Sequence, residues 1–266
     1  IDAGMVHVGF FTFADDVDRL IQIFAIGFAG LFTQFLWRGV HFHLGSQMRD
    51  ALPIARGTAR VLEWLRPWLA QGWRCAEFSP GAGWFVPYLP GERALDPAQV
   101  VAAIAAAFRA ADWPDPWPAL VVEPGRELVA RAGIALYTVG ALKRAGSLSY
   151  AFVDGGMTDN PRPALYGARY RALVANRASD GAARPVTLAG PFCESGDTWP
   201  APVDLPPLEV GDLLAVPLSG APQPSMPSTY NGTPLPAVLW LHAGRADVVQ
   251  ARESFDALWA RDRDPA

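Results

Sequence analysis

The chain has 266 residues, of which 51% are hydrophobic and 18% are charged, and its formal net charge at pH 7 is −4. This length suffices for one large domain or two smaller ones, and the lack of a basic surplus argues against binding to nucleic acid. The two cysteines, Cys75 and Cys193, have neither the spacing of a zinc site nor that of a disulfide framework. We therefore expect a cytoplasmic protein without a metal site.

The first 37 residues bear on two questions, whether the sequence is a fragment and whether it crosses a membrane. The sequence begins at Ile1 rather than at a methionine, so we expect a fragment. Residues 20–37 carry no charge and are just long enough to cross a bilayer. Gln22, Thr33 and Gln34 interrupt this run, which favours a buried helix and strand over a membrane helix.

Three strand–helix repeats follow. The hydrophobic pattern predicts strands at 40–43, 75–78 and 120–122 and helices at 51–70 and 97–111. Asp96 is expected to cap the second helix, with Pro97 at its first position. Each strand runs into a loop that bears Gly or Ser. This alternation is typical of a parallel α/β sheet or barrel, in which ligands bind at the carboxyl ends of the strands.

The pattern changes near residue 134. Short runs rich in β-forming residues alternate with turns rich in Gly and Pro, at 135–139, 150–154, 187–189, 213–216 and 238–241. They predict a mostly antiparallel β domain. We therefore expect an α/β domain over residues 1–133 and a β domain over residues 134–266.

Six motifs could each be an ordinary turn or loop when taken alone. They are HFHLGSQ (41–47), GAGWFVPY (81–88), EPGRELVARAG (123–133), VDGGMTDNPRPALY (153–166), GPFCESGD (190–197) and STYNGTPLPA (228–237). Together, and in this order, they resemble the diaminopimelate decarboxylases, which belong to the fold-type III enzymes that use pyridoxal phosphate. The resemblance implies that residues 1–133 are the second half of a (β/α)8 barrel, that residues 134–266 are the C-terminal β domain, and that a homodimer shares its active site.

The resemblance also assigns residues to the cofactor. His43 matches the imidazole that stacks on the pyridine ring, and Glu123 matches the carboxylate beside the ring nitrogen, which favours the protonated form of that nitrogen. The remaining matches lie around the phosphate and the EPGR turn, at Ser46, Gly81, Ala82, Gly83, Gly125 and Arg126.

The substrate residues follow from the same resemblance. Arg126, Arg162 and Tyr166 match groups that hold the substrate, and an arginine fork suits a carboxylate. Glu194 matches the group that binds the distal ammonium. Cys193 matches the proton donor, delivered by the neighbouring subunit. The implied reaction converts meso-2,6-diaminopimelate to L-lysine and carbon dioxide; the alternatives are a decarboxylase of ornithine or arginine, and a non-catalytic homologue that binds a partner subunit.

Two departures from the family pattern affect this interpretation. The family's cofactor-binding lysine lies upstream of HFHLGSQ, whereas the only lysine of this chain is Lys143, which we interpret as a solvated or structural residue. We therefore expect the chain on its own to be inactive. Pro222 stands where the family has a tyrosine near the phosphate, and proline offers neither a hydroxyl nor a backbone donor.

Overall fold

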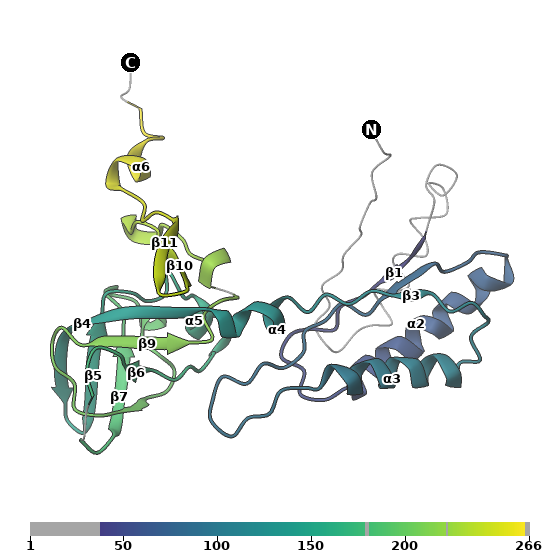
Figure 1. The fold of residues 1–266 in the computed structure, drawn as a ribbon, viewed down its shortest axis with the longest axis horizontal. Helices are drawn as coiled ribbons and strands as arrows, with labels where there is room; N and C mark the ends of the chain where they lie inside the picture. Colours follow the sequence, from purple (N-terminus) through teal and green to yellow (C-terminus); the bar gives the residue numbers. More distant parts are fainter. Residues whose placement is uncertain (1–37, 179–180, 222, 264–266) are drawn as a thin grey trace. The chain divides into compact units, whose positions relative to one another are not determined.

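The structure is a computed structural model that describes residues 38–178, 181–221 and 223–263 (Figure 1). The predictions for residues 1–37 and for Pro222 lie outside the described residues. The chain divides into two compact units. Unit 1 comprises the described residues up to 87 together with residues 91–128, and unit 2 comprises residues 88–90 and the described residues from 129 onward. Among the helices that the structure describes, none has the length and apolar character needed to cross a membrane.

Unit 1 contains a parallel sheet in the strand order β1-β2-β3, joined by two helices. Its elements are β1 (Gly39–His41), α2 (Leu52–Ala70), β2 (Glu77–Ser79), α3 (Pro97–Ala110) and β3 (Ala119–Leu120). The predicted strand–helix alternation is therefore confirmed, although each strand is shorter than predicted and its ends differ by one or two positions. Consecutive parallel strands joined through helices bring their carboxyl ends to one edge of the sheet.

The core of unit 1 lies between this sheet and the two helices, which run side by side (Figure 1). Leu62 and Leu65 from α2 and Val100 from α3 are fully buried there, around Phe78 of β2. Asp96 caps α3 as predicted, since its Oδ1 accepts a hydrogen bond of 2.9 Å from the amide of Ala98. The apolar face of each helix thus fixes it against the sheet.

Unit 2 contains a six-stranded sheet in the order β6-β9-β4-β5-β7-β8. The strands are β4 (Ile134–Ala145), β5 (Leu148–Val153), β6 (Leu173–Val174), β7 (Arg184–Ala189), β8 (Val203–Leu205) and β9 (Leu213–Pro217). All neighbouring pairs are antiparallel except β5 and β7. The first half of β4 pairs with β9 and the second half with β5, and the register shifts between Val139 and Ala141. This bulge lets one long strand serve two neighbours.

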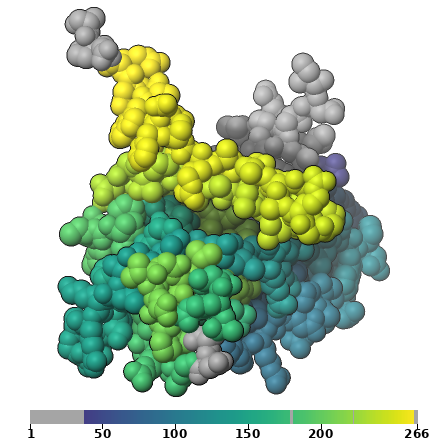
Figure 2. Space-filling view, turned by 60° about the vertical axis from the view of Figure 1, so that its left-hand side comes forward, coloured from purple at the N-terminus to yellow at the C-terminus, as the bar shows by residue number. Residues whose placement is uncertain are grey.

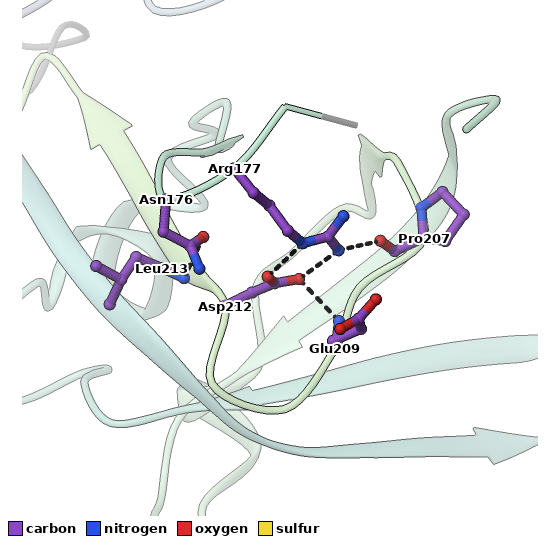
Figure 3. Close-up of polar contacts among 6 residues, drawn as sticks. All are labelled: Asn176, Arg177, Pro207, Glu209, Asp212 and Leu213. Carbon is purple, nitrogen blue, oxygen red and sulfur yellow. Dashed lines mark hydrogen bonds and ion pairs between the residues drawn. The ribbon is translucent and has the colours of Figure 1, made fainter. Parts of the chain in front are cut away.

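Arg177 and Asp212 tie the loop before β9 to the segment that follows β6 (Figure 3). Asp212 also accepts a hydrogen bond from the amide of Glu209, and Asn176 accepts one from the amide of Leu213. These contacts pair polar groups at this end of the sheet, including the buried carboxylate of Asp212.

The chain ends in a two-stranded hairpin, β10 (Val238–His242) with β11 (Arg245–Gln250), followed by α6 (Phe255–Trp259). The sequence predicted β10 but not β11. In the space-filling view these C-terminal residues, drawn in yellow, lie at the surface (Figure 2). Trp240 and Leu241 are 60% and 74% exposed, and Val248 and Trp259 are also exposed. Neither face of the hairpin is buried by the described residues.

Candidate active site

In unit 1, candidate residues gather where the three parallel strands end. The amide of Phe42 donates to the carbonyl of Ser79, and the amide of Glu123 donates to the carbonyl of Gly81, at 2.9 and 3.0 Å. These bonds continue the pairing of the sheet beyond the last residues of its strands. The loops after β1, β2 and β3 are thereby held side by side at the carboxyl edge, as the sequence predicts.

Glu123 is held from two sides in this group of loops. The Ser79 hydroxyl donates to its Oε1 at 3.2 Å, and the Nε2 of His41 lies 3.1 Å from its Oε2. Its side chain is nonetheless 52% exposed, so part of the carboxylate faces outward. A carboxylate fixed in direction and open on one side can accept a proton-bearing nitrogen of a ligand.

His41 and Ser79 are contacts that the sequence analysis did not identify. His41 lies two positions before His43, so the two side chains share one face of an extended chain. Ser79 is the last residue of β2. The alternating HFH pattern was the available signal, but nothing in it indicates a partner 82 residues away.

His43 lies against the glycine loop after β2. Burial, and secondarily the neighbouring His41, lower the pKa of His43 below its usual value, while Glu123 opposes the shift. The imidazole is therefore mostly uncharged at neutral pH. A Cβ at Gly81 would come within 2.8 Å of His43 Nδ1, and one at Gly83 would overlap the carbonyl oxygen of Gly45. Both glycines also have positive φ, so only glycine allows this close approach.

These residues of unit 1 fit an aromatic, anionic cofactor. An uncharged imidazole, a half-exposed carboxylate and a glycine loop too tight for side chains lie at one edge of the sheet. Ser46 lies exposed in the loop after His43. The helix α4 (Gly125–Val129) begins at the glycine of the EPG turn, with Arg126 as its second residue. The cofactor roles assigned to these residues, and to His43, Glu123 and the loop of Gly81, Ala82 and Gly83, stay predictions.

In unit 2, Arg162 opens the short helix α5 (Arg162–Tyr166) and is only 6% exposed. Its Nη1 donates to the hydroxyl of Tyr170 at 2.6 Å, and its guanidinium lies 5.0 Å from the ring centre of Tyr88 and 5.7 Å from that of Tyr170. Its buried Nε has no hydrogen-bond partner, and none of the ion pairs found among the described residues includes it. Tyr166, at the other end of α5, is 67% exposed.

Cys193 and Glu194 lie in the turn between β7 and the short helix η2 (Ser195–Asp197). A Cβ at Gly196 would lie 3.2 Å from that of Ala164, so this turn packs directly against α5. The hydroxyl of Tyr230 donates to Glu194 Oε1 at 2.6 Å, and this bond raises the pKa of Tyr230. The helix that carries Arg162 and the turn that carries Cys193 and Glu194 therefore pack against each other in unit 2.

Cys193 also borders an open, mostly apolar hollow of about 390 Å³. Its lining residues are Gly140, Ala141, Phe152, Val153, Asp154, Gly190, Pro191, Phe192 and Cys193. The thiol is exposed and forms no disulfide. Nowhere in the described ranges do three or more metal-binding side chains gather, so those ranges give no support for a metal centre.

Known proteins resemble this chain over most of its length. Residues 12–220 match the family model described as "Pyridoxal-dependent decarboxylase, C-terminal sheet domain". A diaminopimelate decarboxylase of Actinosynnema pretiosum subsp. auranticum is 40% identical over 84% of this chain, and that of Bacillus subtilis (strain 168) is 38% identical over 82%. The chain spans about half the length of these relatives, 51% of each.

Solved structures give the same result. A diaminopimelate decarboxylase from M. jannaschii in complex with L-lysine has a TM-score of 0.84 at 29% identity, covering 94% of this chain and 57% of that one. The enzyme from Helicobacter pylori, also complexed with L-lysine, has a TM-score of 0.78 at 30% identity, covering 91% and 58%. The resemblance read from six motifs is thus confirmed over most of the chain.

Proposed function

This chain belongs to the family of pyridoxal-dependent decarboxylases, and we propose that it serves the decarboxylation of meso-2,6-diaminopimelate to L-lysine and carbon dioxide. The proposal draws on relatives that bear the name diaminopimelate decarboxylase and on structural neighbours that hold L-lysine. One observation of this chain carries the choice of substrate: Arg162 is a buried cation without an anionic partner among the described residues.

A buried guanidinium without a counter-ion is costly, and an entering carboxylate would remove that cost. The fork of an arginine can bind both oxygens of a carboxylate. Diaminopimelate carries two carboxylates, of which one leaves and the other needs a cation. Ornithine and arginine have no second carboxylate, so Arg162 favours diaminopimelate over both.

The residues of unit 1 would hold pyridoxal phosphate. When bound, this cofactor supplies an electron sink for the electron pair left by the departing carboxylate. Glu123 would keep a proton on the ring nitrogen, because an adjacent carboxylate favours the charged form. His43 would lie against the ring as a neutral imidazole. The phosphate would be bound by Ser46, Gly81, Ala82 and Gly83, with Gly125 and Arg126 beside the ring and substrate.

The residues of unit 2 would act on the substrate. Arg162 would bind its remaining carboxylate with Tyr166 at its side, and Glu194, fixed by Tyr230, would bind the distal ammonium. Cys193 would donate the proton that replaces carbon dioxide.

We propose that these groups act in a cytoplasmic homodimer with a shared active site. In this proposal residues 1–133 are half of a (β/α)8 barrel, and residues 134–266 are the C-terminal β domain. The exposed apolar hairpin β10–β11 supports a contact with another chain.

The test is release of carbon dioxide from three carboxyl-labelled amino acids. Because the only lysine of this chain is Lys143 and the chain on its own is expected to be inactive, the test uses the full-length gene product. It is supplied with pyridoxal phosphate and incubated with meso-diaminopimelate, L-ornithine or L-arginine. We expect release from diaminopimelate alone, and we expect Arg162→Lys to raise KM for it at least tenfold, since lysine keeps the charge but loses the fork. Arg144→Lys on the exposed end of β4 is the control. Release from ornithine or arginine at an equal rate would overturn the proposed substrate.

A further inference from the structure

Asp197 is a buried carboxylate to which the proposed reaction assigns no role. It is the last residue of η2 and only 3% exposed. Its Oδ1 accepts a hydrogen bond of 2.7 Å from the amide of Met157, and its Oδ2 accepts one of 2.8 Å from the amide of Phe192. One side chain therefore joins the DGGM loop after β5 to the GPF turn that leads into Cys193.

The two segments approach Asp197 so closely that side chains are excluded there. A Cβ at Gly156 or at Gly190 would overlap the Asp197 carboxylate. The main chain closes the same turn, because the amide of Gly190 donates to the Asp197 carbonyl at 2.8 Å. Gly156 and Gly190 are thus explained by the space that this carboxylate occupies.

We propose that Asp197 is the positioning residue of the active site: it fixes the backbone of residues 190–194 and thereby the directions of Cys193 and Glu194. The inference rests on the proposed function, which makes Cys193 the proton donor and Glu194 the ammonium ligand. Proton transfer requires the donor within hydrogen-bond reach of the reacting carbon's position, and a shift of about 1 Å can cost about a hundredfold in rate. A turn held from two sides by a buried carboxylate meets that requirement.

Asp197→Asn tests the inference with a side chain of the same shape. An amide has one oxygen and one NH2 group, so either orientation leaves one of the two backbone amides facing a donor. We expect amide hydrogen exchange at Phe192 or Met157 to accelerate about tenfold, because hydrogen bonds to charged acceptors are the stronger ones. The NMR signals of both amide protons should shift, and in the full-length gene product turnover of meso-diaminopimelate should fall at least tenfold.

Two further variants complete the experiment. Gly190→Ala pushes the carboxylate away without changing its charge, and it should reproduce the local exchange and the loss of turnover. Asp204→Asn removes an exposed carboxylate of the same unit, on β8, and should leave exchange at residues 190–194 unchanged. Unchanged exchange in both Asp197→Asn and Gly190→Ala, or equal acceleration in Asp204→Asn, would overturn the inference. A full-length wild-type gene product without turnover would contradict the proposed function instead, while the exchange data still decide whether Asp197 fixes the turn.

Discussion

Arg177 and Asp212 form a two-pronged ion pair, in which Nε donates to Oδ1 at 2.7 Å and Nη2 donates to Oδ2 at 2.8 Å (Figure 3). The same Nη2 also donates to the carbonyl of Pro207, and the amide of Glu209 donates to Asp212 Oδ2. The hydrogen bonds from Arg177 are the main reason why the pKa of Asp212 is lowered to about 2. The pair closes the loop before β9 against the segment after β6.

Asp212→Asn should therefore destabilise unit 2 in a pH-dependent manner. The folded pKa lies below the unfolded value of 3.8, so the contribution of Asp212 is full above pH 3.8 and is lost as the pH falls toward about 2. At pH 7 we expect a loss of about 2 kcal/mol in the free energy of unfolding, the scale of hydrogen bonds to a charged group. Denaturant unfolding at pH 7 and at pH 2.5 measures both values.

The exposed Asp204 on β8 supplies the control, because Asp204→Asn should change the free energy of unfolding by less than about 0.5 kcal/mol. An equal loss at both pH values for Asp212→Asn would contradict the linkage to its ionisation.

The start of α3 permits a local test of stability. Asp96 caps the helix through the amide of Ala98, and Pro97 occupies the first helical position. Asp96→Ala should lower the free energy of unfolding of unit 1 by about 1 kcal/mol, whereas Asp96→Ser should restore most of it because serine is also a good N-cap. Circular dichroism during urea unfolding distinguishes the two variants; equal losses would show that the cap bond contributes little.

This helix also illustrates what the sequence could predict. Local signals such as Asp96-Pro97 and the alternation of strands with helices depend on neighbours in the chain, and both were found correctly. The contacts of Glu123 with His41 and of Arg162 with Tyr88 join segments far apart in the sequence, and no local pattern encodes such partners. The strands β6, β8 and β11, which are short or charged, were missed for a related reason, since pairing rather than hydrophobic periodicity defines them.

The charge of Glu123 should contribute to the affinity for pyridoxal phosphate. Glu123→Gln keeps the shape of the side chain but removes the negative charge that would stabilise the protonated ring nitrogen. We therefore expect the affinity for pyridoxal phosphate to fall about tenfold or more. Equilibrium dialysis with pyridoxal phosphate measures the dissociation constant. Glu77→Gln is the matched control, because Glu77 pairs with the exposed Arg38. An unchanged constant in Glu123→Gln would remove Glu123 from the cofactor site.

Tyr230 should act through Glu194. Tyr230→Phe removes the hydroxyl that donates to Glu194 Oε1 but keeps the ring that packs edge-on against Phe192. Releasing one hydrogen bond to a carboxylate should raise KM for meso-diaminopimelate about tenfold, with a smaller effect on kcat. Steady-state kinetics measure both constants. Tyr150→Phe, on β5, is the control; a fall in kcat without a change in KM would point to a role for Tyr230 outside ammonium binding.

The ionisation of His43 is open to direct measurement, and its neighbours predict how it responds. Burial lowers its pKa, His41 lowers it further and Glu123 raises it. In NMR titrations, Glu123→Gln should therefore lower the pKa of His43, and His41→Asn should raise it.

Because the pKa of His43 in the folded protein lies below the unfolded value of 6.5, the folded protein loses stability as the pH falls below 6.5. His43→Gln should thus reduce the loss of stability between pH 7.5 and pH 5, whereas His242→Gln on the exposed hairpin should not. A pKa of His43 that rises in Glu123→Gln or falls in His41→Asn would contradict the arrangement of these three side chains.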